Sequence, residues 1–501
     1  FYTTSDAGKR VAKQWQGFTL RDVYAVNPID GKSTLIRKNL KGNISSSYSG
    51  NYLLMYDERL KQYQSYNAFT QIINKVAADI QFPLYDEEND VPDDPNAYGI
   101  AKWMEGDKHV LIYDKFDIWK VDPFGKEKSI ILTSGRKNLI QSRLVNLDED
   151  KKFINSNDTI LLKTYNEKTK GSGVSKLFFG NNGKLNLVQT TIPISDCFIT
   201  NLVQSKNSTN FIFTKEKYES SPNLYSANVS GINKFTDLNT QQASYNWGSA
   251  ELFQWKAYTG KLSEGVLYKP ENFDAKKKYP VFMFLYGGPG SQQVTDAWGS
   301  ANYLWYQMLA AKGYIVVCVD PRGTMYRGAE FKKSTYLQLG KLETEDIIAT
   351  GKALQALAYV DPNRIGIMGW SYGGFMASLG ITKGADVFKM AIAVAPVTNW
   401  RYYDNIYTER FMRTPQENAD GYDRNSPINY VDNVKGKYLL IHGSADDNVH
   451  FQNTMDMTSA MVKANKQFDL FVYPNKNHGI YGGNTRNHLY NMMLNYTLEN
   501  L

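Results

Sequence analysis

The sequence predicts two domains of different fold class: an all-β domain in residues 1–246 and an α/β domain with a mostly parallel sheet in residues 247–501. In the second half, apolar strand-like runs alternate with helical segments, which is typical of a parallel sheet covered by helices on both faces. In the first half, short strand-like stretches are broken by Gly, Asn, Asp and Pro. A chain of 501 residues is also too long for a single hydrophobic core.

Four stretches of the first half share one pattern, an aromatic-containing strand that runs into a turn with Gly or Asn. The aromatic residues Trp119, Phe178 and Tyr225 of the last three are 59 and 47 positions apart. A period of ~40–50 residues with several strands per unit indicates propeller blades, and an irregular β-sandwich is the alternative. The four stretches are Arg21–Lys32, Phe116–Lys126, Ser175–Lys184 and Pro222–Gly231.

Only four or five such blades fit before residue 245, and the first of them lacks upstream sequence. We therefore expect a propeller-like domain that is truncated. Its end is expected near Tyr245–Ser249, where the turn-rich composition stops. The chain starts at Phe1 rather than Met, which we attribute to trimming, so a targeting segment cannot be read from it.

The second half is expected to contain six strands and five helices in alternation. The strands are Tyr279–Tyr286, Tyr314–Asp320, Arg364–Gly369, Lys389–Ala395, Lys437–His442 and Phe468–Tyr473. The helices are Asn302–Lys312, Glu343–Tyr359, Tyr372–Thr382, Gln452–Ala464 and Thr485–Glu499. Because the strands are apolar on both faces, the sheet should lie between two layers of helices.

Charge and cysteine content argue against several classes of function. The 57 Lys and Arg residues are scattered among 50 Asp and Glu residues, without a long basic block, so no nucleic-acid partner is expected. Cys197 and Cys318 are too few and too far apart for a disulfide framework or a metal cluster. No run approaches the ~18 apolar residues of a transmembrane helix.

The strongest chemical signal is the pentapeptide Gly369–Gly373, which follows a predicted strand and opens a predicted helix. A G-x-S-x-G pentapeptide in this context is a nucleophile elbow, in which a strained turn presents the serine at the end of the strand. The flanking glycines let the strand and the helix approach each other closely. Ser371 is therefore the candidate nucleophile, and the α/β domain is expected to be an α/β-hydrolase.

A nucleophile elbow requires an acid and then a histidine later in the chain. His478 is the candidate base because it stands beside Gly479 in a loop before the last helix. The acid is expected in the loop after the preceding strand, where either Asp446 or Asp447 could orient the imidazole. The other histidines fit less well, because they precede the elbow, end a strand, share the acid loop or lie in a helix: His109, His442, His450 and His488.

The oxyanion of an acyl-transfer reaction needs two hydrogen-bond donors. One is expected to be the backbone N–H of Tyr372, the residue after the nucleophile. The other should come from the loop Tyr286–Gly290, through a backbone N–H or the Tyr286 hydroxyl. A tight Gly-Pro turn without chemical function is the alternative for this loop.

Together these motifs resemble the prolyl oligopeptidase family, and most closely its dipeptidyl peptidase IV branch. The segments that carry the resemblance are GWSYGG at Gly369–Gly374, HGSADDNVHFQ at His442–Gln452, NHGI at Asn477–Ile480 and LYGGPGS at Leu285–Ser291. The resemblance implies a Ser371–Asp446–His478 triad and an oxyanion hydroxyl from Tyr286. It also implies a catalytic α/β-hydrolase domain preceded by a propeller.

The resemblance further implies a substrate slot for the residue before the scissile bond, usually Pro or Ala. Its predicted walls are Val397, Trp400, Tyr403, Tyr407 and Val449, and Asn448 is predicted to contact the substrate carbonyl. Flat aromatic walls suit a pyrrolidine ring. An aromatic core cluster is the alternative.

One expected feature of the branch is missing. The resemblance implies a Glu-Glu pair and an Arg that hold the amino terminus of the substrate, and no such pair stands in a matching context. Glu87 and Glu88 form the one tempting pair, and their Asp-rich surroundings in Leu84–Pro92 favour a solvated loop. The choice between dipeptidyl, tripeptidyl and oligopeptidase action therefore stays open.

These observations predict a serine peptidase that hydrolyses short peptides, after Pro or Ala, through an acyl-enzyme. Neither a metal nor an organic cofactor is expected. The resemblance favours a secreted or periplasmic location and suggests a homodimer as one assembly. Two alternatives stay open, an esterase or acylaminoacyl-type hydrolase on the same fold and an inactive propeller-based binding protein.

Overall fold

The computed structural model separates the chain into two compact units. Unit 1 contains Phe1–Asn89, Asp93–Glu216 and Pro222–Asp237, and unit 2 contains Asp90–Pro92, Lys217–Ser221 and Leu238–Leu501. Parts of two predicted repeat stretches, residues 181–184 and 229–230, lie outside the described residues. The structure describes residues 1–148, 150–180, 187–195, 197–205, 210–228, 231–256, 260, 262–295, 297–299 and 301–501.

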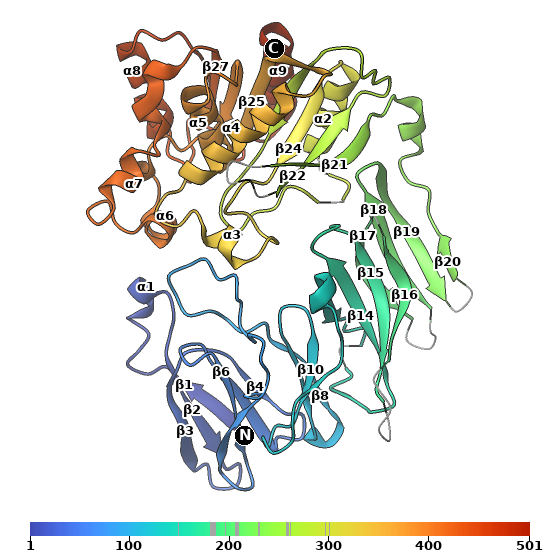
Figure 1. The fold of residues 1–501 in the computed structure, drawn as a ribbon. Helices are drawn as coiled ribbons and strands as arrows, with labels where there is room; N and C mark the ends of the chain where they lie inside the picture. Colours follow the sequence, from blue (N-terminus) through green and yellow to red (C-terminus); the bar gives the residue numbers. More distant parts are fainter. Residues whose placement is uncertain are drawn as a thin grey trace. The chain divides into compact units, whose positions relative to one another are not determined.

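The described part of the first 237 residues is built from small sheets whose strands are mostly neighbours in sequence (Figure 1). Strand pairing is antiparallel, as between β5 and β6, except where β13 pairs parallel with β8. This succession of sheets confirms the predicted propeller-like, all-β domain.

In sheet order, the first sheet contains β1 (Tyr2–Ser5), β2 (Arg21–Val26) and β3 (Ser33–Leu40), and the second contains β4 (Ile44–Ser46), β5 (Tyr52–Asp57), β6 (Gln62–Asn67) and β7 (Ile73–Val76). The third is β11 (Ile130–Ile131), β10 (Ile118–Val121), β9 (Val110–Tyr113), β8 (Ile100–Met104), β13 (Phe153–Ile154). The last two are β12 (Ile140–Leu144), β14 (Thr159–Asn166), β15 (Ser172–Phe178), β16 (Leu187–Ser195), and β17 (Phe198–Gln204), β18 (Phe211–Lys217), β19 (Ser220–Asn228), β20 (Gly231–Lys234). A one-turn helix, α1, spans Lys13–Gln16.

The sheet that contains β9 is covered on both faces by its neighbours. Val110 and Ile112 join a core cluster with Tyr56 and Tyr63 of the preceding sheet. Leu111 joins a different cluster with Leu162 and other residues of the following sheet. Because successive side chains of a strand point to opposite faces, β9 is apolar throughout and packs against one sheet on each side. This face-to-face packing of consecutive sheets is how propeller blades are stabilised.

Unit 2 is organised around one eight-stranded sheet, which confirms the predicted mostly parallel α/β-hydrolase domain. Pairing is antiparallel from β21 through β22 to β24 and parallel through the rest of the sheet. The two antiparallel strands were not predicted, since their polar and apolar residues are mixed. In sheet order the strands are β21 (Ser249–Lys256), β22 (Leu262–Lys269), β24 (Ile315–Val319), β23 (Tyr279–Phe284), β25 (Val360–Trp370), β26 (Met390–Val394), β27 (Lys437–Gly443) and β28 (Asp469–Tyr473).

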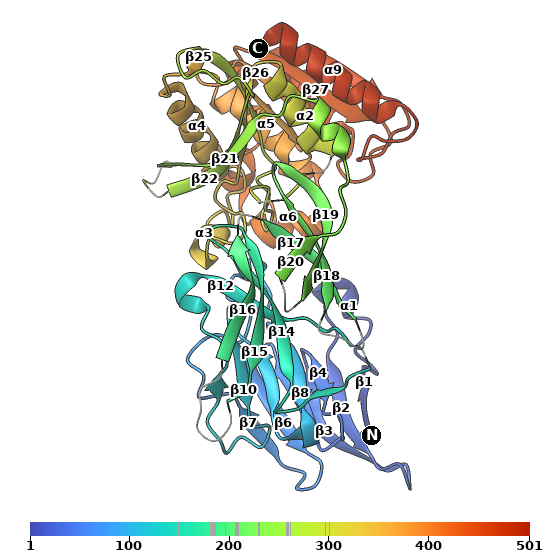
Figure 2. The same cartoon turned by 90° about the vertical axis from the view of Figure 1, so that its right-hand side faces the viewer.

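Helices cover both faces of this sheet. One core cluster contains Ile347 of α4, Phe375 of α5 and Met457 of α8, and the other contains Leu309 of α2 and Leu489 of α9. Figure 2 shows α4 and α9 on opposite sides of the strands. The helices are α2 (Ala301–Ala311), α3 (Ala329–Lys333), α4 (Lys341–Gln355), α5 (Tyr372–Lys383), α6 (Asn405–Met412), α7 (Ala419–Asp423), α8 (Gln452–Lys463) and α9 (Thr485–Asn500). None of the helices in the described ranges is long and apolar enough to cross a membrane.

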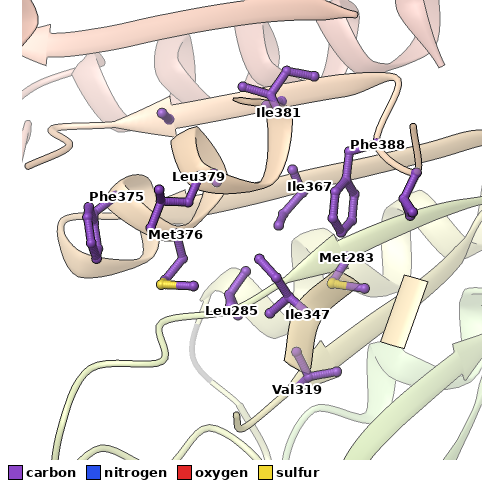
Figure 3. Packing of buried hydrophobic residues seen from close by; sticks show 14 of the residues in the cluster. Met283, Leu285, Val319, Ile347, Ile367, Phe375, Met376, Leu379, Ile381 and Phe388 are labelled. Carbon is purple, nitrogen blue, oxygen red and sulfur yellow. The ribbon is translucent and has the colours of Figure 1, made fainter. Parts of the chain in front are cut away.

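The packing under α5 fixes the direction in which this helix leaves the sheet. Figure 3 shows Met376 of α5 beside Leu285 and Ile347. Gly373 lies so close to the backbone of Leu285 that an added Cβ would collide with its carbonyl oxygen. Helix α5 can therefore start directly at the end of β25, where the predicted elbow stands.

Candidate active site

The turn between β25 and α5 has the geometry of a nucleophile elbow. Ser371 has φ 60° and ψ −116°, and this positive φ is strained for a residue with a side chain. Its N–H donates to the carbonyl oxygen of Val394 at 2.8 Å, which ties the turn to the neighbouring strand. A Cβ on Gly369 would collide with the backbone of Gly373, so the close strand-to-helix approach depends on glycine. Ser371 is half-buried, and its side chain stands at the carboxyl end of the sheet.

His478 and Asp446 form a hydrogen-bonded pair. The Nδ1 atom of His478 lies 2.7 Å from Oδ2 of Asp446, and the imidazole side chain keeps 21% of its surface exposed. The other oxygen, Oδ1, accepts the backbone N–H groups of Asn448 at 3.0 Å and Val449 at 2.9 Å. The carboxylate is thereby fixed by its own loop before it meets the imidazole. With Nδ1 bound in this way, Nε2 is the ring nitrogen left for proton transfer.

A second histidine helps to hold Asp446 in its ionised form. His442 is fully buried, and its Nε2 lies 3.2 Å from Oδ2 of Asp446. Burial disfavours the carboxylate, but hydrogen bonds from His442 and His478 outweigh burial, and the pKa of Asp446 lies well below its usual range. The neighbouring Asp447 is exposed. Of the two acids left open by the residue pattern, the structure brings Asp446 to the imidazole.

The histidine loop is attached to the elbow by the residue before the nucleophile. The indole Nε1 of Trp370 donates to the carbonyl oxygen of His478 at 3.1 Å. The same loop is held to the acid loop by the N–H of Ala445, which donates to the carbonyl oxygen of Lys476 at 3.0 Å. The elbow, the acid loop and the histidine loop thus meet at the carboxyl ends of β25, β27 and β28.

Two candidate donors lie at this edge. Tyr372 is the first residue of α5, and the N–H of a first helical residue has no acceptor within its helix. Tyr286 follows β23 and is half-buried, with its ring centroid 6.0 Å from that of Tyr372. Burial raises the pKa of the Tyr286 phenol, and a side-chain hydrogen bond with Ser371 opposes this rise. The Tyr286 hydroxyl therefore stays protonated at neutral pH and lies within reach of the candidate nucleophile.

The predicted substrate slot divides into exposed and buried residues. Tyr403 and Tyr407 are partly exposed, their rings meet edge to face at 5.4 Å, and the Tyr403 hydroxyl donates to Oδ1 of Asn448 at 2.8 Å. Trp400 packs against both tyrosine rings but is only 1% exposed. The other two predicted walls, Val397 and Val449, are 2% and 0% exposed. These three buried residues belong to the core cluster on which the tyrosines pack, so the accessible surface comes from Tyr403, Tyr407 and Asn448.

The interpretation of Glu87 and Glu88 as a solvated loop is wrong. Glu88 is only 7% exposed, and its carboxylate pairs with the ammonium of Lys115 in unit 1. Glu87 is half-buried, with Oε2 3.7 Å from the guanidinium of Arg136, and burial raises the pKa of Glu87. The cationic partners stand 27 and 49 positions further along the chain, where inspection of the acidic segment alone does not find them.

The C-terminal part of the chain matches the model of the prolyl oligopeptidase family over residues 302–501. The solved dipeptidyl peptidase 4 of Porphyromonas gingivalis is 30% identical, with a TM-score of 0.70 and an alignment that covers 96% of this chain and 67% of that one. This chain belongs to the prolyl oligopeptidase family. A second structure of this type, a putative dipeptidyl aminopeptidase IV from Bacteroides ovatus, is 26% identical, with a TM-score of 0.71 over 96% of this chain and 70% of that one.

Curated relatives match the hydrolase half. A probable dipeptidyl-aminopeptidase B of Arthroderma benhamiae is 47% identical over 217 residues, which are 42% of this chain and 24% of that protein. The prolyl endopeptidase FAP of Mus musculus is 42% identical over 248 residues, 47% of this chain and 32% of that protein. The chain thus spans about a quarter to a third of the length of these curated members of the prolyl oligopeptidase family.

Sequence reasoning missed two residues that shape this site. His442 was interpreted as a packed residue at the end of its strand, and its contact with Asp446 was not foreseen; its spacing of four residues from Asp446 is the available signal. Glu343 was placed in a helix without a role, yet its side chain bonds to Tyr372. A Gly-x-x-Glu pattern at the start of α4 signals a helix cap but not this second contact.

Proposed function

We propose that this chain carries the active site of a serine peptidase that cleaves short peptides after Pro or Ala. The observation that supports this most strongly is the Asp446–His478 pair, held by Trp370 against an elbow that presents Ser371. The membership of the prolyl oligopeptidase family supports the same reaction class. The names of the relatives, dipeptidyl-aminopeptidase B and prolyl endopeptidase, support peptide substrates.

In the proposed reaction, the Ser371 oxygen attacks the scissile carbonyl carbon while Nε2 of His478 takes the hydroxyl proton. The carbonyl oxygen becomes an oxyanion, which accepts hydrogen bonds from the Tyr286 hydroxyl and the Tyr372 N–H. The imidazolium, stabilised by Asp446, then gives its proton to the leaving amine as the C–N bond breaks. Water attacks the resulting ester in the same way, and release of the acid restores Ser371.

The proposed preference for Pro or Ala rests on the two partly exposed tyrosines, Tyr403 and Tyr407. The edge-to-face pair of Tyr403 and Tyr407 offers flat apolar surface on which a pyrrolidine ring or a methyl group can lie. Asn448, whose amide oxygen already accepts the Tyr403 hydroxyl, keeps its amide N–H groups for the substrate carbonyl. A long charged side chain would lose its hydration in this slot without gaining a charged partner among these residues.

Hydrolysis of Gly-Pro p-nitroanilide, compared with a Gly-Pro ester, tests the proposal. We expect the wild-type chain to cleave both compounds, and Ser371→Ala to reduce turnover at least about 1,000-fold with an unchanged unfolding curve. Cleavage of the ester alone would instead support an esterase or acylaminoacyl-type hydrolase. Equal rates for wild type and Ser371→Ala would contradict the proposal.

A further inference from the structure

A buried carboxylate lies directly behind the candidate oxyanion donors. Glu343, the third residue of α4, is 0% exposed. Its Oε1 accepts the Tyr372 hydroxyl at 2.7 Å, and its Oε2 accepts the N–H of Gly340 at 3.0 Å. The carboxylate thus joins the first turn of α4 to the residue that follows Ser371.

Capping of α4 accounts for only one of these two bonds. A Glu or Gln at the third helical position commonly accepts the N–H of the residue before the helix, and a neutral Gln serves this purpose as well. The bond to Tyr372 uses the other oxygen. Burial raises the pKa of Glu343 to about 7, against hydrogen bonds from Tyr372 and Gly340 that favour the charged form. An acid in such an environment is costly for folding, which points to a use beyond the cap.

Tyr372 is in contact with both parts of the proposed oxyanion site. Its side chain is 3% exposed, with ring centroids 6.0 Å from Tyr286 and 5.5 Å from Trp400. Its own N–H is one proposed donor, and the ring of Tyr286, which carries the other, packs against it. A shift of the Tyr372 ring would therefore displace both donors and the aromatic floor beneath Tyr403.

We propose that Glu343 is a positioning residue, which holds the Tyr372 hydroxyl and thereby fixes the Tyr372 N–H and the Tyr286 hydroxyl for the transition state. The inference rests on the proposed serine peptidase function, because only an acyl-transfer reaction develops charge at this position. Donors that are slightly displaced stabilise the oxyanion less while the ground-state complex changes little, so the effect falls on kcat rather than on KM.

Three variants test this with Gly-Pro p-nitroanilide: Glu343→Gln, Tyr372→Phe and the double variant. Tyr372→Phe removes this hydrogen bond and keeps the ring and the N–H, whereas Glu343→Gln removes the negative charge of its acceptor. We expect each single variant to lower kcat about ten-fold, with KM changed less than about two-fold. The double variant should lose no more than Tyr372→Phe alone, because both changes act on the same hydrogen bond. Glu345→Gln is the control, since Glu345 lies on the same helix but pairs with Arg322 at 3.1 Å, and it should keep the wild-type kcat.

Unchanged kcat in both single variants, a change confined to KM, or losses that multiply in the double variant would each overturn the inference. If Glu343→Gln does not fold, Tyr372→Phe alone decides, since it removes the bond itself. If the wild-type chain does not cleave the anilide, or Ser371→Ala cleaves it equally fast, the proposed function fails and the inference fails with it. If the wild type cleaves the anilide and Ser371→Ala does not, while the Glu343 and Tyr372 variants keep the wild-type kcat, the proposed function stands and only the inference about Glu343 fails.

Discussion

Asp446 in unit 2 and Glu88 in unit 1 are both buried carboxylates beside a basic side chain, yet their surroundings differ. The partner of Asp446 is an imidazole that is 21% exposed and belongs to a loop attached to the elbow of Ser371. The partner of Glu88 is the ammonium of Lys115, which is 9% exposed and also lies 3.3 Å from the carboxylate of Glu167.

The difference separates a chemical role from a structural one. An imidazole has two nitrogens, so a bond from Nδ1 to Asp446 leaves Nε2 for proton transfer. The Lys115 ammonium is a single cation that pairs with two carboxylates of its own unit, and it has no second reactive atom to offer. Burial and charge pairing alone therefore do not identify an active site; the proposed triad also depends on a partner with a second, accessible reactive atom.

The largest expected effect separates Asp446 from its neighbour. Asp446→Asn should reduce kcat about 10⁴-fold, because the imidazole loses the acceptor that fixes its tautomer. Asp447→Asn is the matched control, an exposed carboxylate one residue away, and should change kcat no more than a few-fold. Steady-state kinetics on Gly-Pro p-nitroanilide measure both. A larger loss for Asp447→Asn would reverse the assignment.

The next effect concerns the Tyr286 hydroxyl. Tyr286→Phe removes one donor and little volume, so kcat should fall by about 10²–10³-fold with KM nearly unchanged. The unfolding curve should stay close to that of the wild type, because the ring that packs on Tyr372 is retained. A change in KM alone would place Tyr286 in substrate binding instead.

A smaller effect is expected at the aromatic slot. Competition between peptides that differ only at the residue before the scissile bond should show a preference for Pro over Ala, and a stronger rejection of Lys and Glu. Tyr403→Ala should reduce the Pro-to-Ala ratio of kcat/KM, which is set by about 1–3 kcal/mol of shape selection. A preference for a charged residue in the wild type would contradict the slot, though it would leave the triad proposal in place.

The smallest effect on activity, and a large one on stability, is expected in unit 1. Lys115→Met leaves Glu88 and Glu167 buried without their cation, which should cost about 3–5 kcal/mol in the free energy of unfolding. The kcat of the folded protein should stay within about two-fold of the wild type. Urea unfolding and kinetics on the same sample check both expectations, with the exposed Lys137→Met as control. A loss of kcat without a loss of stability would contradict the structural role assigned to the Glu88–Lys115 pair.

Much of unit 2 could be predicted because its signals are local. Continuous apolar runs such as Met390–Val394 are strands of a sheet buried on both faces, and the glycines around Ser371 mark a turn that only they allow. The edge strand β21 and its neighbour β22 lack such runs and are not predicted. In the first half, the repeat of aromatic strands and turns indicated the sheets but not their individual bounds.

The residue pattern alone does not predict the side-chain pairings, because they are decided by tertiary structure. Asp446 and Asp447 are adjacent and identical; the family resemblance implies Asp446, and the physical difference is the turn that aims two backbone N–H groups at Asp446. An aromatic pattern such as Trp400–Tyr407 fits a core and a slot equally well; in the structure Trp400 lies in the core, while Tyr403 and Tyr407 are partly exposed. Glu88 resembled a solvated residue because Lys115 is distant in sequence.

A fluorophosphonate probe, followed by mass spectrometry of the digested protein, tests whether Ser371 is an activated nucleophile. We expect one covalent adduct, on the peptide that contains Ser371, and much slower labelling in Asp446→Asn. Labelling of a serine other than Ser371 would contradict this assignment. So would the absence of labelling in folded wild-type protein that also fails to cleave the anilide.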